Sequence, residues 1–207
     1  MKTIRSHSRP CRARFLPARS AAAGGARAAA IAVALLLGLP SPAPAQWQAP
    51  DRADQAAAMD RLKFLSGDWE GSGWMQMGPE RSEFASSERV SYAAGGLALV
   101  VRGVHRAPLP DGTEKVVHDA LGVLTWSSED GAYRFASKLD NGFDGVYRAE
   151  LTESGDLEWS IPVPGREMRY TIHVDGDRWT ETGRMSTDGG ETWSEFFGMT
   201  LERVGAR

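Results

Sequence analysis

The chain contains little cysteine and little histidine. Its 207 residues include one cysteine, Cys11, and four histidines, of which His105, His118 and His173 lie beyond residue 45. A segment without cysteine forms no disulfide and no thiolate metal site. The three histidines show neither an H-x-H pair nor the i, i+4 spacing of a helical zinc site. We therefore predict no dedicated metal site.

The G-x-S-x-G motif of serine hydrolases is also missing. The Ser-Gly pairs at Ser66 and Ser154 fall in expected turns, where the hydroxyl is not presented as a nucleophile. The sequence therefore gives weak support to a Ser-His-Asp hydrolase. A hydrolase of the nucleophile-elbow type is not indicated.

No apolar run is long enough to cross a bilayer. The run at residues 28–39 has about a dozen residues, against the roughly 20 that a spanning helix needs. It lies in a segment with seven basic residues and no acid, and Ala43-Pro44-Ala45 follows as an Ala-x-Ala cleavage signal. We predict a signal peptide over residues 1–45 and no stable membrane insertion after its cleavage. A retained anchor is the alternative.

Removal of the leader makes the protein acidic. The chain has 24 Lys and Arg and 27 Asp and Glu, so loss of seven basic residues leaves 17 against 27, a net charge of −10. Non-specific binding of nucleic acid depends on neutralising phosphates with Lys and Arg, so no nucleic-acid partner is expected. The expected location is the periplasm, with secretion outside the cell second.

The rest of the chain reads as one short helix followed by many strands. The spacing of Met59, Leu62 and Leu65 predicts an amphipathic helix that begins in a flexible segment at residues 46–60. Strand-like runs then alternate with Gly, Asp, Asn and Pro clusters, several of them Asp-Gly or Asn-Gly turns that suit tight hairpins. The expected strands are 68–77, 83–93, 97–106, 115–127, 132–139, 145–153, 156–162, 167–174, 178–185 and 192–204.

This pattern predicts an all-β fold, a single antiparallel up-and-down barrel of about ten strands over residues 61–204. Closure of the sheet removes exposed edges that would promote aggregation. The first strand supports a barrel because Trp69, Gly71 and Gly73 share one face. Glycines allow a sharp bend or a close backbone approach, and we expect the Trp69 indole to close one end of the barrel.

The inward face is harder to choose, because both faces of residues 115–127 are largely apolar. By analogy with the first strand, we expect the face that carries His118, Ala120 and Gly122 to point inward. A polar side chain among small residues is a common way to orient a ligand inside a barrel.

The segment 186–193 (STDGGETW) has the S-x-D-x-G-x-T-W pattern of the Asp-box hairpin found in sialidase-type propellers. Its aspartate caps the turn and its tryptophan packs beneath. A propeller needs several blades of four strands, and this chain has one copy of the pattern. We interpret the segment as a structural hairpin.

Two segments carry a resemblance to a known group. Residues 64–71 (FLSGDWEG) resemble the Gly-x-Trp start of calycin barrels, which include lipocalins, fatty-acid-binding proteins and nitrobindins. Residues 188–193 and 199–204 (DGGETW and MTLERV) resemble an uncharacterised bacterial family of the same barrel group. Nitrobindins hold haem through a histidine near the start of the last strand, whereas residues 193–204 contain none. We therefore expect no haem and no other cofactor.

The sequence favours a non-enzymatic, exported, lipocalin-like protein that binds a small hydrophobic molecule inside its barrel. The candidate ligand-binding residues are His118, Tyr147, Arg102, His105 and Trp69, and no catalytic residue is assigned. Two alternatives remain at this stage: an isomerase or hydrolase that uses His118 with a carboxylate across the lumen, or a filled barrel that acts as a structural module. The oligomeric state is not predicted.

Overall fold

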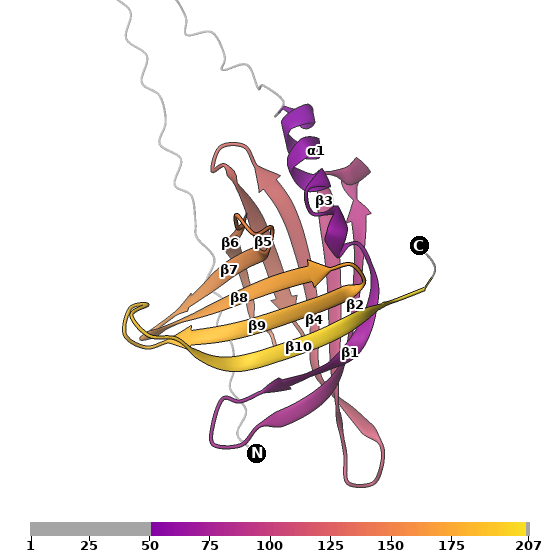
Figure 1. Cartoon of the computed structure of the whole chain (residues 1–207), viewed down its shortest axis with the longest axis vertical. Coiled ribbons are helices and arrows are strands. Elements are labelled where there is room, and N and C mark those ends of the chain that lie inside the picture. The colour runs from indigo at the N-terminus through magenta and orange to yellow at the C-terminus, as the bar shows by residue number, and fades with distance from the viewer. Residues whose placement is uncertain (1–50, 206–207) are drawn as a thin grey trace, which may run out of the picture. The chain divides into compact units, whose positions relative to one another are not determined.

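Ten antiparallel strands close into a barrel in the computed structural model of the chain, which describes residues 51–205 (Figure 1). Each strand pairs with its neighbours in sequence, and β1 pairs with β10 to close the sheet. The predicted up-and-down barrel is confirmed, whereas the predicted signal peptide at residues 1–45 lies outside the described residues. The strands are β1 (Gly67–Met75), β2 (Ser82–Ala93), β3 (Ala98–Pro108), β4 (Glu114–Ser127), β5 (Ala132–Leu139), β6 (Asp144–Leu151), β7 (Leu157–Val163), β8 (Arg166–Asp175), β9 (Arg178–Ser186) and β10 (Ser194–Val204).

A short helix precedes the barrel. Helix α1 (Arg52–Asp60) begins at the cap Asp51, whose carboxylate accepts hydrogen bonds from the first-turn backbone, the shorter from Ala53 N at 2.8 Å. The helical run then tightens into the 3₁₀ turn η1 (Lys63–Leu65) instead of continuing as one helix. No helix within residues 51–205 has the length and apolar character to cross a membrane.

The helix and the turn cover one end of the barrel. Met59, Leu62 and Leu65 are fully buried there, as their spacing predicted. Tyr92 and Tyr133 donate hydrogen bonds to backbone carbonyls of the last helical turn, both at 2.7 Å. These bonds hold the helix end to β2 and β5.

Trp69 lies in the plug beneath this cover. Its indole is fully buried and packs edge to face on Trp179, with ring centroids 5.4 Å apart. Its N–H donates to the Leu65 carbonyl at 2.9 Å, and the Arg203 guanidinium lies 3.9 Å from its ring centroid. The expectation that this indole closes one end of the barrel is confirmed.

The glycines of β1 are needed for close approach. A Cβ on Gly71 would collide with the Thr200 backbone carbonyl of the neighbouring strand, and a Cβ on Gly73 would lie 2.6 Å from the Phe84 ring. The Phe84 ring therefore leans over Gly73 into the lumen. A larger residue at either position would displace the neighbouring strand or the ring.

The inward face of β4 is the predicted one. Gly122 and Leu124 are buried, whereas Leu121 is 48% exposed on the outer surface. Gly122 accommodates the Phe135 ring, which would collide with a Cβ at that position. Small residues in this barrel thus receive large side chains from neighbouring strands.

One seam of the barrel is incomplete. Strand β6 pairs with β7 only through residues 149–151, whose partners are residues 157–159. Residues 144–148 and 160–163 belong to the same two strands but do not pair with each other. The two strands therefore separate toward the end of the barrel opposite α1.

Candidate functional site

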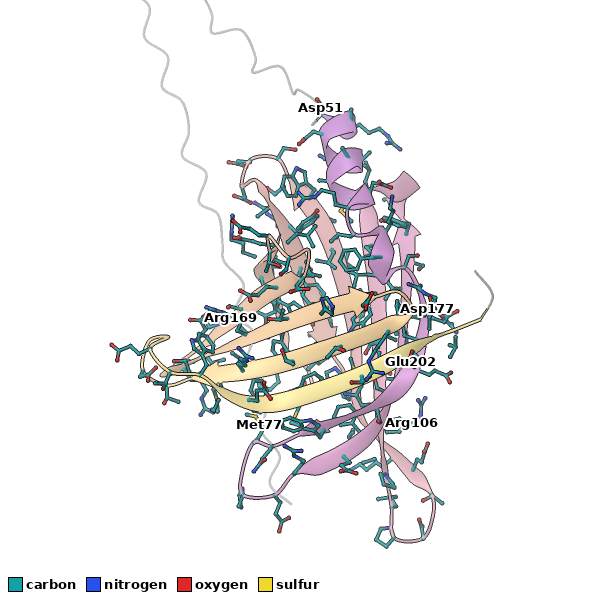
Figure 2. All side chains as sticks on the ribbon, in the orientation of Figure 1. Asp51, Met77, Arg106, Arg169, Asp177 and Glu202 are labelled. Atoms are coloured by element: carbon teal, nitrogen blue, oxygen red, sulfur yellow. The ribbon has the colours of Figure 1, made fainter. Side chains whose placement is uncertain are left out.

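The barrel is hollow at the end opposite α1. The hollow has a volume of about 1550 Å³, above the range of roughly 300–1,000 Å³ typical of small-molecule sites. Figure 2 labels Asp51 at the helix end and Met77, which lines the hollow, at the other end. A filled barrel does not fit this volume. Inward-facing residues that line the hollow are Met75, Phe84, His105, His118, Ser137, Tyr147, Trp159, Ile161, Met168, Tyr170 and Phe196.

Three stacked rings form part of its wall. Phe84, His105 and His118 come from β2, β3 and β4 and lie one behind another. The ring centroids of Phe84 and His105 are 4.3 Å apart, and those of His105 and His118 are 4.6 Å apart. Both histidines were separate ligand-binding candidates from the sequence, and the structure brings their rings into contact.

Both imidazoles are uncharged at neutral pH. Burial lowers the pKa of His105 to about 4. Burial also lowers the pKa of His118, helped by the neighbouring His105 and opposed by Asp140 and Asp119. A neutral imidazole has one donor and one acceptor nitrogen, so His118 can give or receive one hydrogen bond in the hollow.

A second aromatic group lines the opposite wall. Trp159 and Tyr170 stack with ring centroids 5.2 Å apart, and Phe135 meets Trp159 edge to face at 5.1 Å. Tyr147 lies nearby on β6, with its hydroxyl folded over Gly145. Burial raises the pKa of the Tyr170 phenol, so it stays protonated and can donate a hydrogen bond.

Two carboxyl groups that were not among the candidates from the sequence are buried beneath the hollow. Glu88 of β2 and Glu181 of β9 are 7% and 9% exposed. Burial raises the pKa of each to about 8, and Glu88 further raises that of Glu181. Trp179 Nε1 donates to Glu181 Oε2 at 3.3 Å. The available signal was strand parity, because Glu88 shares its face with Phe84 and Val90.

Glu88 is the carboxyl that approaches a histidine. Its Oε1 atom lies 3.6 Å from His105 Nε2. The raised pKa of Glu88 and the lowered pKa of His105 make this a contact between a protonated acid and a neutral imidazole, not an ion pair. The neighbouring Ser86 hydroxyl is buried and has no hydrogen-bond partner among residues 51–205. This polar group thus retains unused hydrogen-bonding capacity.

The other two candidate residues lie away from the hollow. Arg102 is on the outer face of β3, where its guanidinium lies 3.6 Å from the Asp119 carboxylate. Trp69 is sealed in the end plug and does not line the hollow. His118, His105 and Tyr147 are the candidates that the structure places around one space.

The surroundings of His118 and of β10 bear on the alternatives of catalysis and haem binding. Within the described residues no carboxylate hydrogen-bonds to it, and its contact with His105 is a ring stack. No group of three or more His, Cys, Asp or Glu in residues 51–205 is placed to hold a metal ion. The buried Phe196 and Phe197 stand near the start of β10, so that strand offers no imidazole to haem iron.

The Asp-box segment forms a tight turn between β9 and β10. Asp188 accepts hydrogen bonds from the Thr192 backbone at 2.9 Å and from the Ser186 hydroxyl at 2.7 Å. A hydrogen bond from the Thr192 hydroxyl contributes most to lowering the pKa of Asp188, and these two bonds add to it. Trp193 Nε1 donates to the Gly190 carbonyl at 3.0 Å. The segment is a structural hairpin, as interpreted from the sequence.

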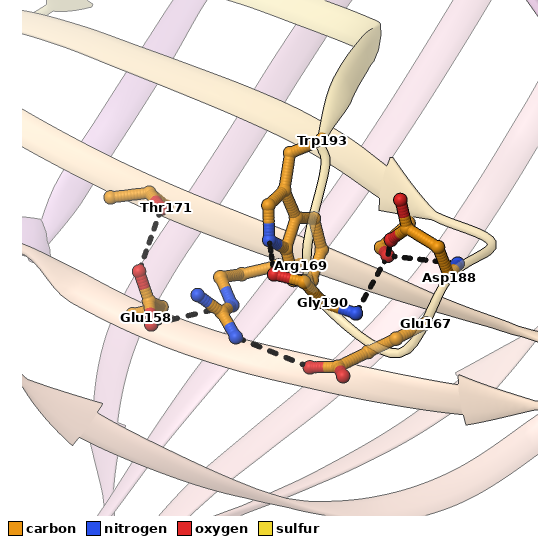
Figure 3. A network of polar contacts seen from close by, with 8 residues as sticks. Glu158, Glu167, Arg169, Thr171, Asp188, Gly190 and Trp193 are labelled. Carbon is orange, nitrogen blue, oxygen red and sulfur yellow. Dashed lines mark hydrogen bonds and ion pairs between the residues drawn. The ribbon is translucent and has the colours of Figure 1, made fainter.

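Arg169 fixes this hairpin to the barrel (Figure 3). Its guanidinium lies 4.3 Å from the centroid of the Trp193 ring. It also lies 3.7 Å from a Glu158 oxygen and 3.4 Å from a Glu167 oxygen. The positive charge of Arg169 is therefore balanced by Glu158 and Glu167 at the rim of the barrel.

Comparison with solved structures supports the fold. Rv2717c of M. tuberculosis is similar with a TM-score of 0.54 and 20% identity, over 73% of this chain and 100% of that one. The S-type phycobiliprotein lyase CPES of Guillardia theta is similar with a TM-score of 0.53 and 9% identity, over 72% and 94%. No family model and no curated protein sequence matches the chain. The chain thus shares its barrel fold with these two proteins.

Proposed function

We propose that the protein is an exported binding protein that holds a small, largely apolar molecule in the hollow of its barrel. The observation that carries this proposal is the open space of about 1550 Å³ with aromatic walls at the end opposite α1. Ligand sites of this kind are mostly apolar and have a few polar groups that orient the ligand. The basic leader and its cleavage signal at residues 43–45 support export to the periplasm.

The polar contacts come from His118 and Tyr147. Both line the hollow, and each can donate or accept a hydrogen bond in its neutral form. The stack on His105 fixes the plane of the His118 ring. A ligand with one carbonyl or hydroxyl group and an apolar body suits these walls better than an ion, because a charge without a buried partner is strongly disfavoured in such a space.

A matched pair of variants tests whether the hollow binds. Ser137 lines the hollow, while the next residue, Lys138, is on the outer surface with its ammonium 3.3 Å from the Asp144 carboxylate. We expect saturable fluorescence enhancement with the neutral probe Prodan. Ser137→Phe should weaken Prodan binding at least about tenfold by filling space in the hollow, and Lys138→Phe should leave Prodan binding unchanged.

Native mass spectrometry of protein purified from its own periplasm completes the test. It should detect a bound apolar molecule and an N-terminus at Gln46. No uptake of Prodan by the wild-type protein, together with no co-purified molecule, would refute the binding function. An uncleaved leader would refute only the proposed location.

A further inference from the structure

The incomplete seam between β6 and β7 is part of the hollow. Inward-facing Tyr147 and Ile161 line it, and so do outward-facing Val146 and Pro162 from the same unpaired stretches. Adjacent residues of a strand point to opposite faces of the sheet. The hollow therefore touches both faces of the wall at the stretch where the β6–β7 ladder is absent.

Apolar side chains stand at the outer edges of this opening, beside charged ones. Val146 on β6 is 67% exposed, and Phe143, in the turn before it, is 74% exposed. Pro162 on the facing strand has no backbone N–H, so it could not complete a normal ladder there. Charged residues also line the hollow here, and Arg148 Nε lies 2.6 Å from Glu150 Oε1.

A compact ligand does not account for these features. It would fill the interior and leave Val146 and Phe143 in water. A flexible apolar chain that ran from the hollow across the seam would cover both side chains. It would also occupy the space between the separated strands, where the hollow extends outward.

We propose that the seam between β6 and β7 is a binding groove for the apolar chain of an elongated, lipid-like ligand. The compact end of that ligand lies in the hollow, and its chain passes between Tyr147 and Ile161 to the outer surface at Val146. This inference rests on the proposed binding function and adds the shape of the ligand and a second binding region to it.

The test uses two probes with the same fluorophore. Prodan carries a short propionyl group, and Laurdan carries a dodecanoyl chain in its place. Val146 and Pro162 would be partners if the β6–β7 ladder continued, since Ala149 pairs with Trp159. A short bismaleimide between Val146→Cys and Pro162→Cys, in a Cys11→Ser chain, bridges the seam. Mass spectrometry verifies the bridge.

A second cross-link serves as the matched control. Val100 and Val123 are directly paired on the outer faces of β3 and β4, where the ladder is continuous. The bridge across the seam should weaken Laurdan binding at least about tenfold and leave Prodan binding within about twofold. The bridge at Val100→Cys and Val123→Cys should change neither. Val146→Asp, which needs no cross-linking, should reproduce the selective loss of Laurdan.

The results separate the two proposals. If Prodan binds but neither the bridge nor Val146→Asp affects Laurdan selectively, the groove is refuted and the binding function stands. If neither probe binds the unbridged protein, both proposals are refuted.

Discussion

The carboxyl group of Glu88 occupies the space above Gly103 on the neighbouring strand. A Cβ on Gly103 would lie 2.5 Å from Glu88 Oε1 and 2.7 Å from Oε2. The two residues are register partners between β2 and β3. The absence of a side chain at Gly103 therefore makes room for a buried acid.

We expect Gly103→Ala to destabilise the protein by about 1–3 kcal/mol, the usual effect of overpacking a filled site. Urea denaturation measures the change. Gly78→Ala is the control, because a Cβ at Gly78 meets nothing within 4 Å. In a Glu88→Ala background the effect of Gly103→Ala should largely disappear, since neighbouring residues are not additive. An equal effect in both backgrounds would contradict the contact.

The buried acids should make stability fall between pH 6.5 and 8. The pKa of Glu88 is raised from 4.5 to about 8, so over this range the folded state keeps a proton that the unfolded state has released. The free energy of unfolding therefore decreases as pH rises. His105, with its pKa lowered to about 4, has the opposite effect, but only between pH 4 and 6.5. The interval above 6.5 isolates the carboxyl groups.

Glu88→Gln should remove about 1–2 kcal/mol of this pH-dependent loss, because each titrating group contributes about 1.4 kcal/mol per pH unit. Urea midpoints at pH 6.5 and pH 8 provide the measurement. Glu153→Gln, in the exposed turn between β6 and β7, is the control and should follow the wild type. A Glu88→Gln variant with the wild-type pH dependence would show that Glu88 does not retain its proton.

Replacement of the end plug should be costly. Trp69→Ala removes a fully buried indole, and we expect a loss of about 3–5 kcal/mol. Trp69→Phe should lose less, because much of the ring volume remains while the hydrogen bond to Leu65 is removed. Trp74→Ala is the comparison on the same strand. Trp74 faces outward beneath the Arg81 guanidinium, and its loss should cost less than Trp69→Phe.

His118→Ala should weaken the binding of Prodan by about 2–10-fold, the effect of one lost hydrogen bond to the ligand carbonyl. The Prodan emission maximum should also shift to shorter wavelength, because the carbonyl loses its donor. Arg102→Ala should change neither quantity, because Arg102 lies outside with Asp119. A larger effect from Arg102→Ala than from His118→Ala would place the ligand on the outer surface.

Much of the barrel architecture can be predicted from the sequence. The Trp69 strand, the turn residues and the alternation of β4 specify the barrel and its inward face, because hairpin turns and strand parity are local properties. The closing pair of β1 and β10 follows from the strand count and the need to protect edges. The continuous helix expected through Leu65 breaks after Asp60, where the chain tightens to bring Leu62 and Leu65 both onto the barrel.

The candidate site was less accessible from the sequence. His118 and His105 are on adjacent strands, but their stack depends on register, which is shifted by a bulge after His105. Glu88 shares its strand face with Phe84 and Val90, which indicates burial, but only the three-dimensional structure shows that Glu88 and Glu181 are buried together. Arg102 was a candidate ligand-binding residue, and the parity of β3 turns its side chain outward.

The pairing of Trp69 with Arg203 joins two positions that are nearly the whole barrel apart in sequence. Arg203 also donates to the carbonyls of Ser66 and Phe64 and lies 3.1 Å from the Asp177 carboxylate. These contacts of Arg203 can form only after β10, the last strand, has been synthesised. A chain truncated before β10 would keep nine strands, but the edges of β1 and β9 would lack hydrogen-bond partners. We expect such a product to aggregate through these edges instead of forming a smaller barrel.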